Sequence, residues 1–117
     1  MRYFFTLDAG LPSSIAVSTA YNQCGSATGP TPWSGNVYYV EVSCVGVKIA
    51  PAGQSESRKQ VQFRMTSSGG GWNNANDWSY TGMAASGATP GRMPNIVLYD
   101  KGGRIWGTEP GAGTPQP

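Results

Sequence analysis

Short runs of alternating polar and apolar residues constrain the fold of this chain more than any other feature of its sequence. In the clearest run, KQVQFRM at residues 59–65, the apolar residues Val61, Phe63 and Met65 alternate with polar ones, as in a strand with one buried face. Similar runs, bounded by turn-forming residues, occupy the ranges 2–8, 14–21, 36–44, 94–100 and 104–107. No stretch of a dozen residues free of glycine and proline has helical spacing. The pattern predicts an all-β domain, an antiparallel β-sandwich or jelly roll.

The length of the chain limits it to one domain, because 117 residues form one hydrophobic core and not two. Seventeen glycines and nine prolines indicate many turns, while four tryptophans, six tyrosines and three phenylalanines supply the apolar area that a disordered chain lacks. The last segment, GTEPGAGTPQP at residues 107–117, has the composition of a linker. We expect the folded domain to cover residues 1–110 and a linker to start at residues 111–117, as in a modular protein.

The charge pattern argues against nucleic acid and membrane surfaces as partners. The net charge is +2, and basic and acidic residues are interspersed without a block of lysine or arginine. No apolar run approaches membrane-spanning length, and the first residues do not have the pattern of a signal peptide.

Two cysteines, Cys24 and Cys44, lie twenty positions apart. They cannot complete a tetrahedral zinc site, because the chain has no histidine. A disulfide and a pair of buried thiols remain, and we favour the disulfide if the protein is secreted. Closing that loop would stabilise the fold by about 3 kcal/mol.

Catalysis is not expected from the residues present. The absence of histidine and of a GxSxG motif excludes the ordinary serine and cysteine hydrolase arrangements. Glycoside hydrolysis needs two carboxylates that flank the bond. Of the six acidic residues, two fall in a turn and in the tail, and a solvated strand face explains Glu41. The sequence therefore predicts binding. The acidic residues are Asp8, Glu41, Glu56, Asp77, Asp100 and Glu109.

One segment, GGGWNNANDWSY at residues 69–80, combines two tryptophans with asparagines, an aspartate and three glycines. Such a loop could wrap a metal ion, present its rings to a ligand, or fold its tryptophans into the core. From the residues alone, the simpler interpretation is that Asp8 and Asp77 cap turns. We expect Trp78 to be a core residue at the start of a strand, and Trp72 to face outward.

Six stretches follow one another along the chain: RYFFTLDAG, AYNQC, SGNVYYVEVSC, IAPAGQSESRKQVQFRM, WNNANDWSYTGM and NIVLYDKGGRIWGTEP. In this order they resemble the family 3 carbohydrate-binding modules over nearly the whole chain, and most of all the subtype fused to family 9 glycoside hydrolases. The resemblance implies a nine-stranded jelly roll, a structural calcium ion (Ca2+), secretion to the extracellular space and action on cellulose. Family members carry further strands before RYFFTLD, so the opening strands are expected to be missing. That would leave a sheet edge uncovered, open to pairing with a neighbouring chain.

The resemblance also implies two sets of site residues. Calcium takes six to eight oxygen ligands. The family pattern places them at Thr6, Asp8, Asn73, Asn76 and Asp77. A flat carbohydrate-binding strip is implied at Arg64 and Trp72, with Tyr21 as a stand-in for the family's tyrosine, and Gln60 and Gln62 are added because they share the outward row of Arg64. The histidine of the family strip has no counterpart here, and an ordinary solvated strand face is an equal explanation for Gln60, Gln62 and Arg64.

We therefore expect a non-catalytic module that binds cellulose or a related β-glucan and guides an attached glycoside hydrolase, as part of a secreted cellulase. The alternative is an interdomain module that docks on a family 9-type hydrolase and has little cellulose affinity of its own. A third hypothesis is an adhesive domain for other β-glucans or chitin.

Overall fold

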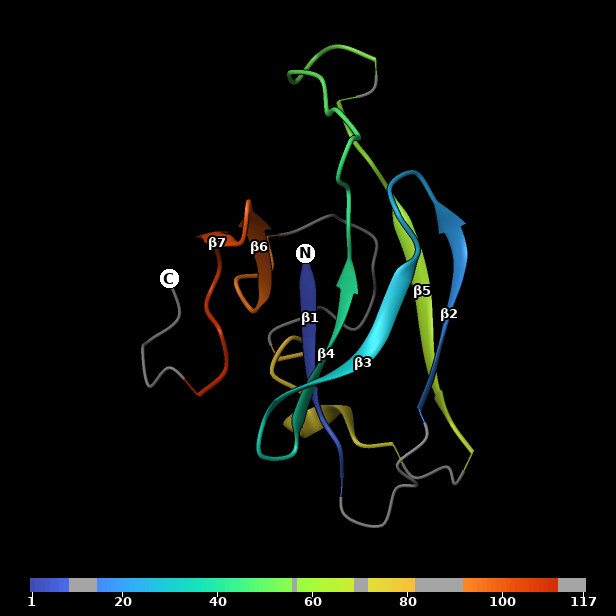
Figure 1. The fold of residues 1–117 in the computed structure, drawn as a ribbon, viewed down its shortest axis with the longest axis vertical. Coiled ribbons are helices and arrows are strands. Elements are labelled where there is room, and N and C mark those ends of the chain that lie inside the picture. The colour runs from blue at the N-terminus through green and yellow to red at the C-terminus, as the bar shows by residue number, and fades with distance from the viewer. Residues whose placement is uncertain (9–14, 56, 69–71, 82–91, 112–117) are drawn as a thin grey trace.

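The computed structural model describes residues 1–8, 15–55, 57–68, 72–81 and 92–111 (Figure 1). These residues contain seven strands and one turn of 3-10 helix, with no helix long and apolar enough to cross a membrane. The elements are β1 (Arg2–Thr6), β2 (Ile15–Asn22), β3 (Ala27–Ser34), β4 (Val37–Val42), β5 (Val61–Ser67), η1 (Asn74–Asn76), β6 (Ile96–Asp100) and β7 (Gly103–Trp106). The predicted all-β class is confirmed.

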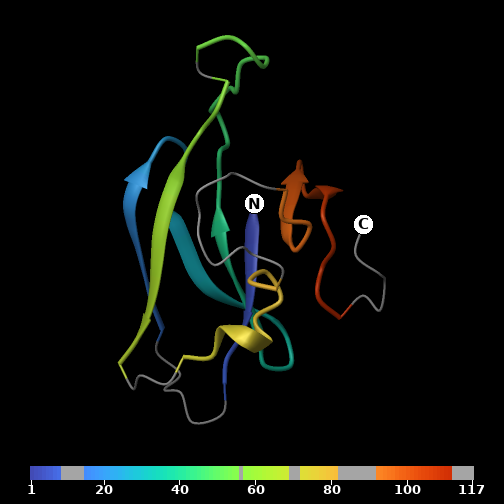
Figure 2. The same ribbon diagram turned by 180° about the vertical axis from the view of Figure 1, so that it is seen from behind.

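The strands form two antiparallel sheets of unequal width (Figure 2). The wider sheet has the order β3-β4-β1-β6-β7, and the narrower one consists of β2 and β5. Each of the six predicted runs forms a strand in the described ranges, with ends that differ by a few residues. The described ranges hold seven strands, against the nine that the resemblance implies.

The strand β3 was not predicted, because its sequence ATGPTPWS reads as a proline-rich loop. It lies at the edge of the wider sheet and pairs only with β4, with two register shifts. An edge strand tolerates prolines because their missing N–H groups face away from the ladder. Gly29 has a φ of +136°, and a Cβ there would lie 2.8 Å from the carbonyl oxygen of Tyr39. Only glycine fits this close approach.

The core lies between the two sheets. Phe5, Val40 and Val42 from the wider sheet are buried there, together with Ile15 from β2. The alternation of residues 36–44 thus gives the correct inward face. Val61, Phe63 and Met65 pack against this cluster from β5, as the alternation of residues 59–65 predicts.

The predicted disulfide is confirmed. Cys24, in the connection between β2 and β3, is bonded to Cys44, just beyond the end of β4. The bond links the β2–β3 connection to the end of β4 in the wider sheet. Both cysteines pack against the core cluster.

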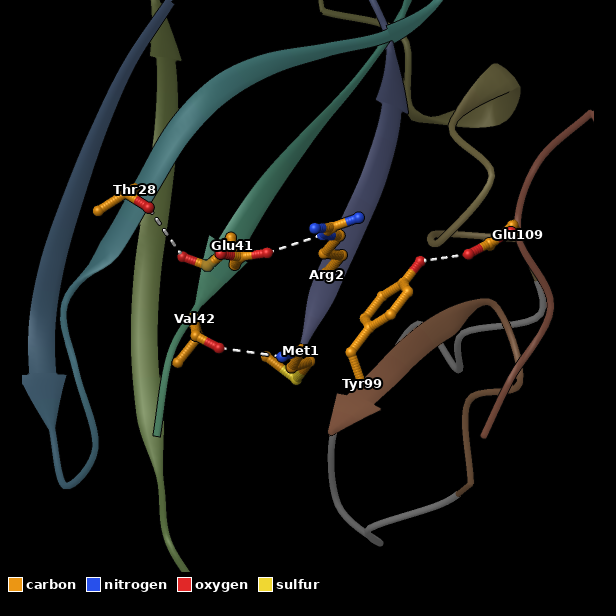
Figure 3. A network of polar contacts seen from close by, with 7 residues as sticks. All are labelled: Met1, Arg2, Thr28, Glu41, Val42, Tyr99 and Glu109. Carbon is orange, nitrogen blue, oxygen red and sulfur yellow. Dashed lines mark hydrogen bonds and ion pairs between the residues drawn. The ribbon is translucent and has the colours of Figure 1, made fainter. Parts of the chain in front are cut away.

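The outer face of the wider sheet carries a polar network (Figure 3). Arg2 forms an ion pair with Glu41 at 2.7 Å, and its guanidinium lies 4.4 Å from the ring centroids of both Tyr39 and Tyr99. Tyr99 donates to Glu109 at 2.7 Å. Burial and the bond to Glu109 raise the pKa of Tyr99 to about 12. The segment after β7 is thus fastened onto the sheet.

Phe4 and Trp33 fill the same outer face beneath that segment. Phe4 is fully buried, its ring 5.1 Å from that of Trp33 in an edge-on contact. The Trp33 indole N–H donates to the carbonyl of Pro110, which is itself buried. Trp33 therefore packs beneath the segment that follows β7. The boundary at residue 110 stays a prediction.

Ser79 offers a sharp test of this packing, because its fully buried hydroxyl serves two backbone groups. It accepts from the N–H of Phe4 at 2.7 Å and donates to the carbonyl of Asn95 at 2.5 Å. In Ser79→Ala both groups lose their partner, and we expect the free energy of unfolding to fall by about 1–3 kcal/mol. Urea denaturation measures the loss. The exposed Ser68→Ala serves as the control and should stay within about 0.5 kcal/mol of wild type; equal effects of the two substitutions would contradict the assigned role.

Candidate functional site

The exposed face of the narrower sheet brings together three of the predicted carbohydrate-binding residues. Gln62 and Arg64 project outward from β5, and Gln60 continues the row just before the strand. Their neighbours Val61 and Phe63 point to the core, because successive side chains of a strand alternate between faces. The three polar side chains therefore lie in one line along the exposed face.

Tyr21 joins this face because of a β-bulge. In a regular β2 strand Tyr21 would share the inward face of Thr19. The pairing shifts between Thr19, which opposes Phe63, and Tyr21, which opposes Gln62. The extra residue, Ala20, turns Tyr21 onto the face of Gln62, and 47% of Tyr21 is exposed.

Small and polar residues of β2 complete the face, and sequence reasoning did not include them. Ser18 lies directly opposite Arg64, and Ala16 lies opposite Thr66; all four are exposed. The alternation of residues 14–21 indicates that Ala16 and Ser18 share a face. Only the pairing register shows that this face is the one beside Arg64. Because these side chains are short, they leave the surface beside Arg64 level.

Trp72 lies elsewhere, and the expectation that it faces outward is wrong. It is partly buried against the core, with its ring centroid 5.5 Å from that of Phe5. Its indole N–H donates to Oδ2 of Asp77 at 3.0 Å. Both its ring and its donor are therefore occupied inside the domain. The contact of Trp72 with a ligand stays a prediction, and its position does not form a platform with Tyr21 and Arg64.

Trp78 is not among the residues that pack against the core cluster, and it lies in a turn and not at the start of a strand as expected. It is partly buried, and its indole N–H donates to the carbonyl of Thr108 at 2.8 Å. The strand expected after Trp78 does not form in the described residues, because the backbone of residues 79–81 bonds back onto Phe4 and Asp77.

The five predicted metal ligands come together at the end of β1, around η1. The N–H of Thr6 donates to Oδ1 of Asp77 at 2.9 Å, and its hydroxyl donates to the carbonyl of Asn76 at 3.0 Å. Asp8 accepts from the N–H of Asn73 at 3.3 Å and from the side-chain amide of Asn76. Segments about seventy positions apart in the sequence thus meet here.

Two carboxylates of unequal environment lie in this cluster. Asp77 is almost fully buried, whereas Asp8 is partly exposed. Burial raises the pKa of Asp77 above its ordinary value, and the nearby charge of Asp8 adds to this, while the bonds from Thr6 and Trp72 oppose it. A cation beside the two carboxylates would favour their charged forms.

The donor set fits a hard cation. Hydroxyl, amide, backbone carbonyl and carboxylate oxygens are the ligands of calcium. No cluster of three or more histidine, cysteine, aspartate or glutamate side chains occurs in the described ranges, so neutral oxygens would have to supply most of the ligands. A soft metal such as zinc, which prefers sulfur and nitrogen, does not suit this site.

Taken together, an antiparallel β-sandwich with a level exposed face of tyrosine, arginine, glutamine and serine has the architecture of a carbohydrate-binding module. The chain matches the family described as "Cellulose binding domain" over residues 1–107, and it belongs to that family. Members of the family are binding modules and not enzymes.

Relatives and solved structures agree with this assignment. The chain is 42% identical over 111 residues to "Endoglucanase B" of Cellulomonas fimi, covering 94% of this chain and 10% of the relative. It is 32% identical over 100 residues to "Endoglucanase 4" of Bacillus sp. (strain KSM-522), covering 82% of this chain and 15% of the relative. The structure of endoglucanase CelQ from Clostridium thermocellum complexed with cellotetraose superposes with a TM-score of 0.81 and 26% identity, over 95% of this chain and 20% of that one. The chain thus spans a small part of each of these proteins.

Trp72→Phe separates a structural from a ligand-binding role of this tryptophan. The variant keeps an aromatic ring beside Phe5 but loses the N–H donor to Asp77, and hydrogen bonds to charged groups contribute about 1.5–3 kcal/mol. We expect a fall in unfolding free energy of that size, with retention on cellulose unchanged once the variant is folded. Trp78→Phe, which loses a bond to a neutral carbonyl, is the matched control and should cost about 0.5–1.5 kcal/mol. A stable Trp72→Phe variant that no longer binds cellulose would contradict this assignment.

Proposed function

We propose that this domain binds cellulose through the exposed face of β2 and β5, with Tyr21, Gln60, Gln62 and Arg64 as contact residues. The observation that carries the proposal is the bulge in β2, which turns Tyr21 onto the same face as Gln62 and Arg64. An aromatic ring and hydrogen-bonding side chains on one level surface are what a crystalline polysaccharide requires.

The chemistry of this face matches that of a glucan surface. The faces of glucose rings expose C–H groups that stack on aromatic rings, and their hydroxyl groups pair with arginine and amide side chains. Several sugars contacted at once add their modest individual energies. Because the side chains stand on a paired strand, they are held in place before binding, which lowers the entropy cost.

The proposed role of the domain is to hold an attached glycoside hydrolase on its insoluble substrate. The relatives are named endoglucanases, and the domain corresponds to a small part of each. The confirmed disulfide suits the oxidising conditions outside the cell, which supports secretion. We further propose that the neighbouring catalytic domain is of the family 9 type, on the resemblance of the YNQC and NDWS stretches.

Substitutions at Tyr21 and Arg64 test the proposed face. A stacking contact contributes about 0.5–1.5 kcal/mol beyond burial, so Tyr21→Ala should weaken retention on microcrystalline cellulose by about twofold to tenfold. We expect a similar loss for Arg64→Ala. Depletion isotherms with the purified domain measure both. Arg104→Ala, on an exposed position of β7 in the other sheet, is the matched control and should bind as wild type.

The outcome also discriminates between the candidate functions. If the wild-type domain is not retained on cellulose, but raises the activity of a fused hydrolase, the interdomain docking function replaces the proposed one. Stronger retention on chitin or on another β-glucan than on cellulose would instead change the substrate class. Equal losses from Arg104→Ala and Arg64→Ala would show that general charge, not this face, governs retention.

We also propose that the cluster at the end of β1 holds a structural calcium ion through Thr6, Asp8, Asn73, Asn76 and Asp77. The support is the meeting of these oxygen donors around two carboxylates, one of them buried. When bound, the ion would supply positive charge that ties residues 72–77 to the end of β1. No catalytic role follows, because the cluster lies beside the core and not on the exposed face.

Calcium should stabilise the folded domain. At a free concentration one hundred times its dissociation constant, the free energy of unfolding rises by about 2.7 kcal/mol. Thermal unfolding in calcium and in excess chelator measures this difference. Asp8→Asn should abolish most of the calcium-dependent increase, whereas Asp100→Asn, at the exposed end of β6, should keep it. A midpoint that is the same with and without calcium would refute the proposed site.

A further inference from the structure

Gln60 belongs to the proposed sugar-binding face but lies just outside the strand that carries it. β5 begins at Val61, and the last pair of the ladder joins Val61 to Asn22 of β2. The described residues of the connection from β4 to Gln60 form turns but no strand or helix. The binding face therefore ends at Gln60, and the alignment of Gln60 with Gln62 needs a contact beyond the two strands.

That contact comes from Gln23, the residue after β2. The Gln23 N–H donates to the carbonyl of Gln60, and the Gln60 N–H donates to Oε1 of the Gln23 side chain, both at 2.9 Å. In a regular antiparallel ladder the second bond would go to the backbone carbonyl of Gln23, because a hydrogen-bonded pair exchanges both backbone bonds. The side chain of Gln23 thus takes the place of a backbone group and extends the ladder by one pair.

A turn explains why the side chain has this task. Oδ1 of Asn22 accepts from the N–H of Cys24 at 2.8 Å, which makes an Asx turn with Gln23 at its centre. The chain bends at Gln23 and Cys24, so the backbone leaves β5 at the point where Gln60 still needs an acceptor.

Two contacts fix this turn to the wider sheet. The disulfide joins Cys24, directly after Gln23, to Cys44 beyond the end of β4. At Gly25 a Cβ would clash with the carbonyl oxygen of Ser43, so the connection runs close against that end of β4. The acceptor that Gln23 offers to Gln60 therefore stands on a backbone held from both sides.

We infer that Gln23 is a positioning residue of the proposed sugar-binding face, whose side chain holds Gln60 in line with Gln62 and Arg64. The inference rests on the proposed function, since it gives Gln23 no contact of its own with the glucan. The bond between Gln23 and Gln60 lies at the surface, where water can replace a lost partner, so its removal should affect alignment more than stability.

Gln23→Met tests this role, because methionine has nearly the same length and no acceptor at that place. Amide hydrogen exchange at Gln60 should become faster by about twofold to tenfold, the range for one hydrogen bond. Retention on microcrystalline cellulose should fall by about twofold to fivefold. The midpoint of thermal unfolding and the exchange at the buried N–H of Phe4 should stay as in wild type.

Two further variants serve as controls. Gln23→Glu keeps an oxygen in the place of Oε1, so it should keep both the slow exchange at Gln60 and the retention. Gln54→Met makes the same change at an exposed glutamine in the connection before β5, and it should behave as wild type in every measurement.

A double-mutant cycle separates positioning from direct contact. In the Gln60→Ala background, Gln23→Met should cause no further loss of retention, because Gln23 acts through the Gln60 side chain. In the Arg64→Ala background the full loss should remain, since that position is distant from Gln23.

Three results would each overturn the inference: unchanged exchange at Gln60 in Gln23→Met, normal retention of this variant despite faster exchange, or a further loss of retention in the Gln60→Ala background. The last result would mean that Gln23 touches the glucan itself. Absence of retention in the wild-type domain would instead refute the proposed function, and the inference would fall with it.

Discussion

The structure depends on which groups pair with the backbone N–H and C=O groups along the edge of β1, beyond the point where its pairing with β6 ends. β6 pairs with β1 only at Arg2 and Tyr3. Beyond that point the buried side chains of Ser79 and Asp77 accept the N–H groups of Phe4 and Thr6, and the N–H of Ser79 donates back to Phe4. A buried strand edge without partners would cost about 1–3 kcal/mol for each group. The irregular segment that contains Asp77 and Ser79 therefore takes the place of a neighbouring strand, because its side chains accept the hydrogen bonds that a strand's backbone would accept.

The same contacts determine where the proposed calcium site and the proposed sugar-binding face lie. Asp77 can accept from Thr6 only if η1 lies at the end of β1, and that position brings Asn73 and Asn76 to Asp8. It also directs Trp72 onto Phe5, inside the sandwich. The face proposed to bind sugar is thus left to β2 and β5 alone, and its one exposed aromatic residue depends on the bulge that turns Tyr21 outward.

The parts of the fold that follow from alternation were predictable, while those that depend on an irregularity were not. Residues 59–65 give the correct buried face, and the runs 94–100 and 104–107 coincide with β6 and β7, which pair across a turn where Lys101 and Gly102 both have positive φ. β3 was missed because proline argues against strands except at an edge, and no sequence pattern shows which strand is the edge. Trp72 was misplaced because three preceding glycines suggest an exposed loop. The indole N–H of Trp72 donates to Asp77, and Asp77 is held in place by its bond from Thr6 of β1. No local sequence pattern shows that long-range contact.

The use of the tryptophans bears on the strength of binding. Trp33, Trp72 and Trp78 all direct their N–H groups to acceptors within the domain, and Trp106 lines a hollow beside β6. None of them stands beside Tyr21 on the exposed face. A face with one stacking ring gains about 0.5–1.5 kcal/mol from it, so polar contacts must supply much of the remaining affinity. We therefore expect weak and reversible attachment to each stretch of glucan. Such attachment would suit a domain that keeps an endoglucanase near its substrate while allowing it to move from one cleavage site to the next.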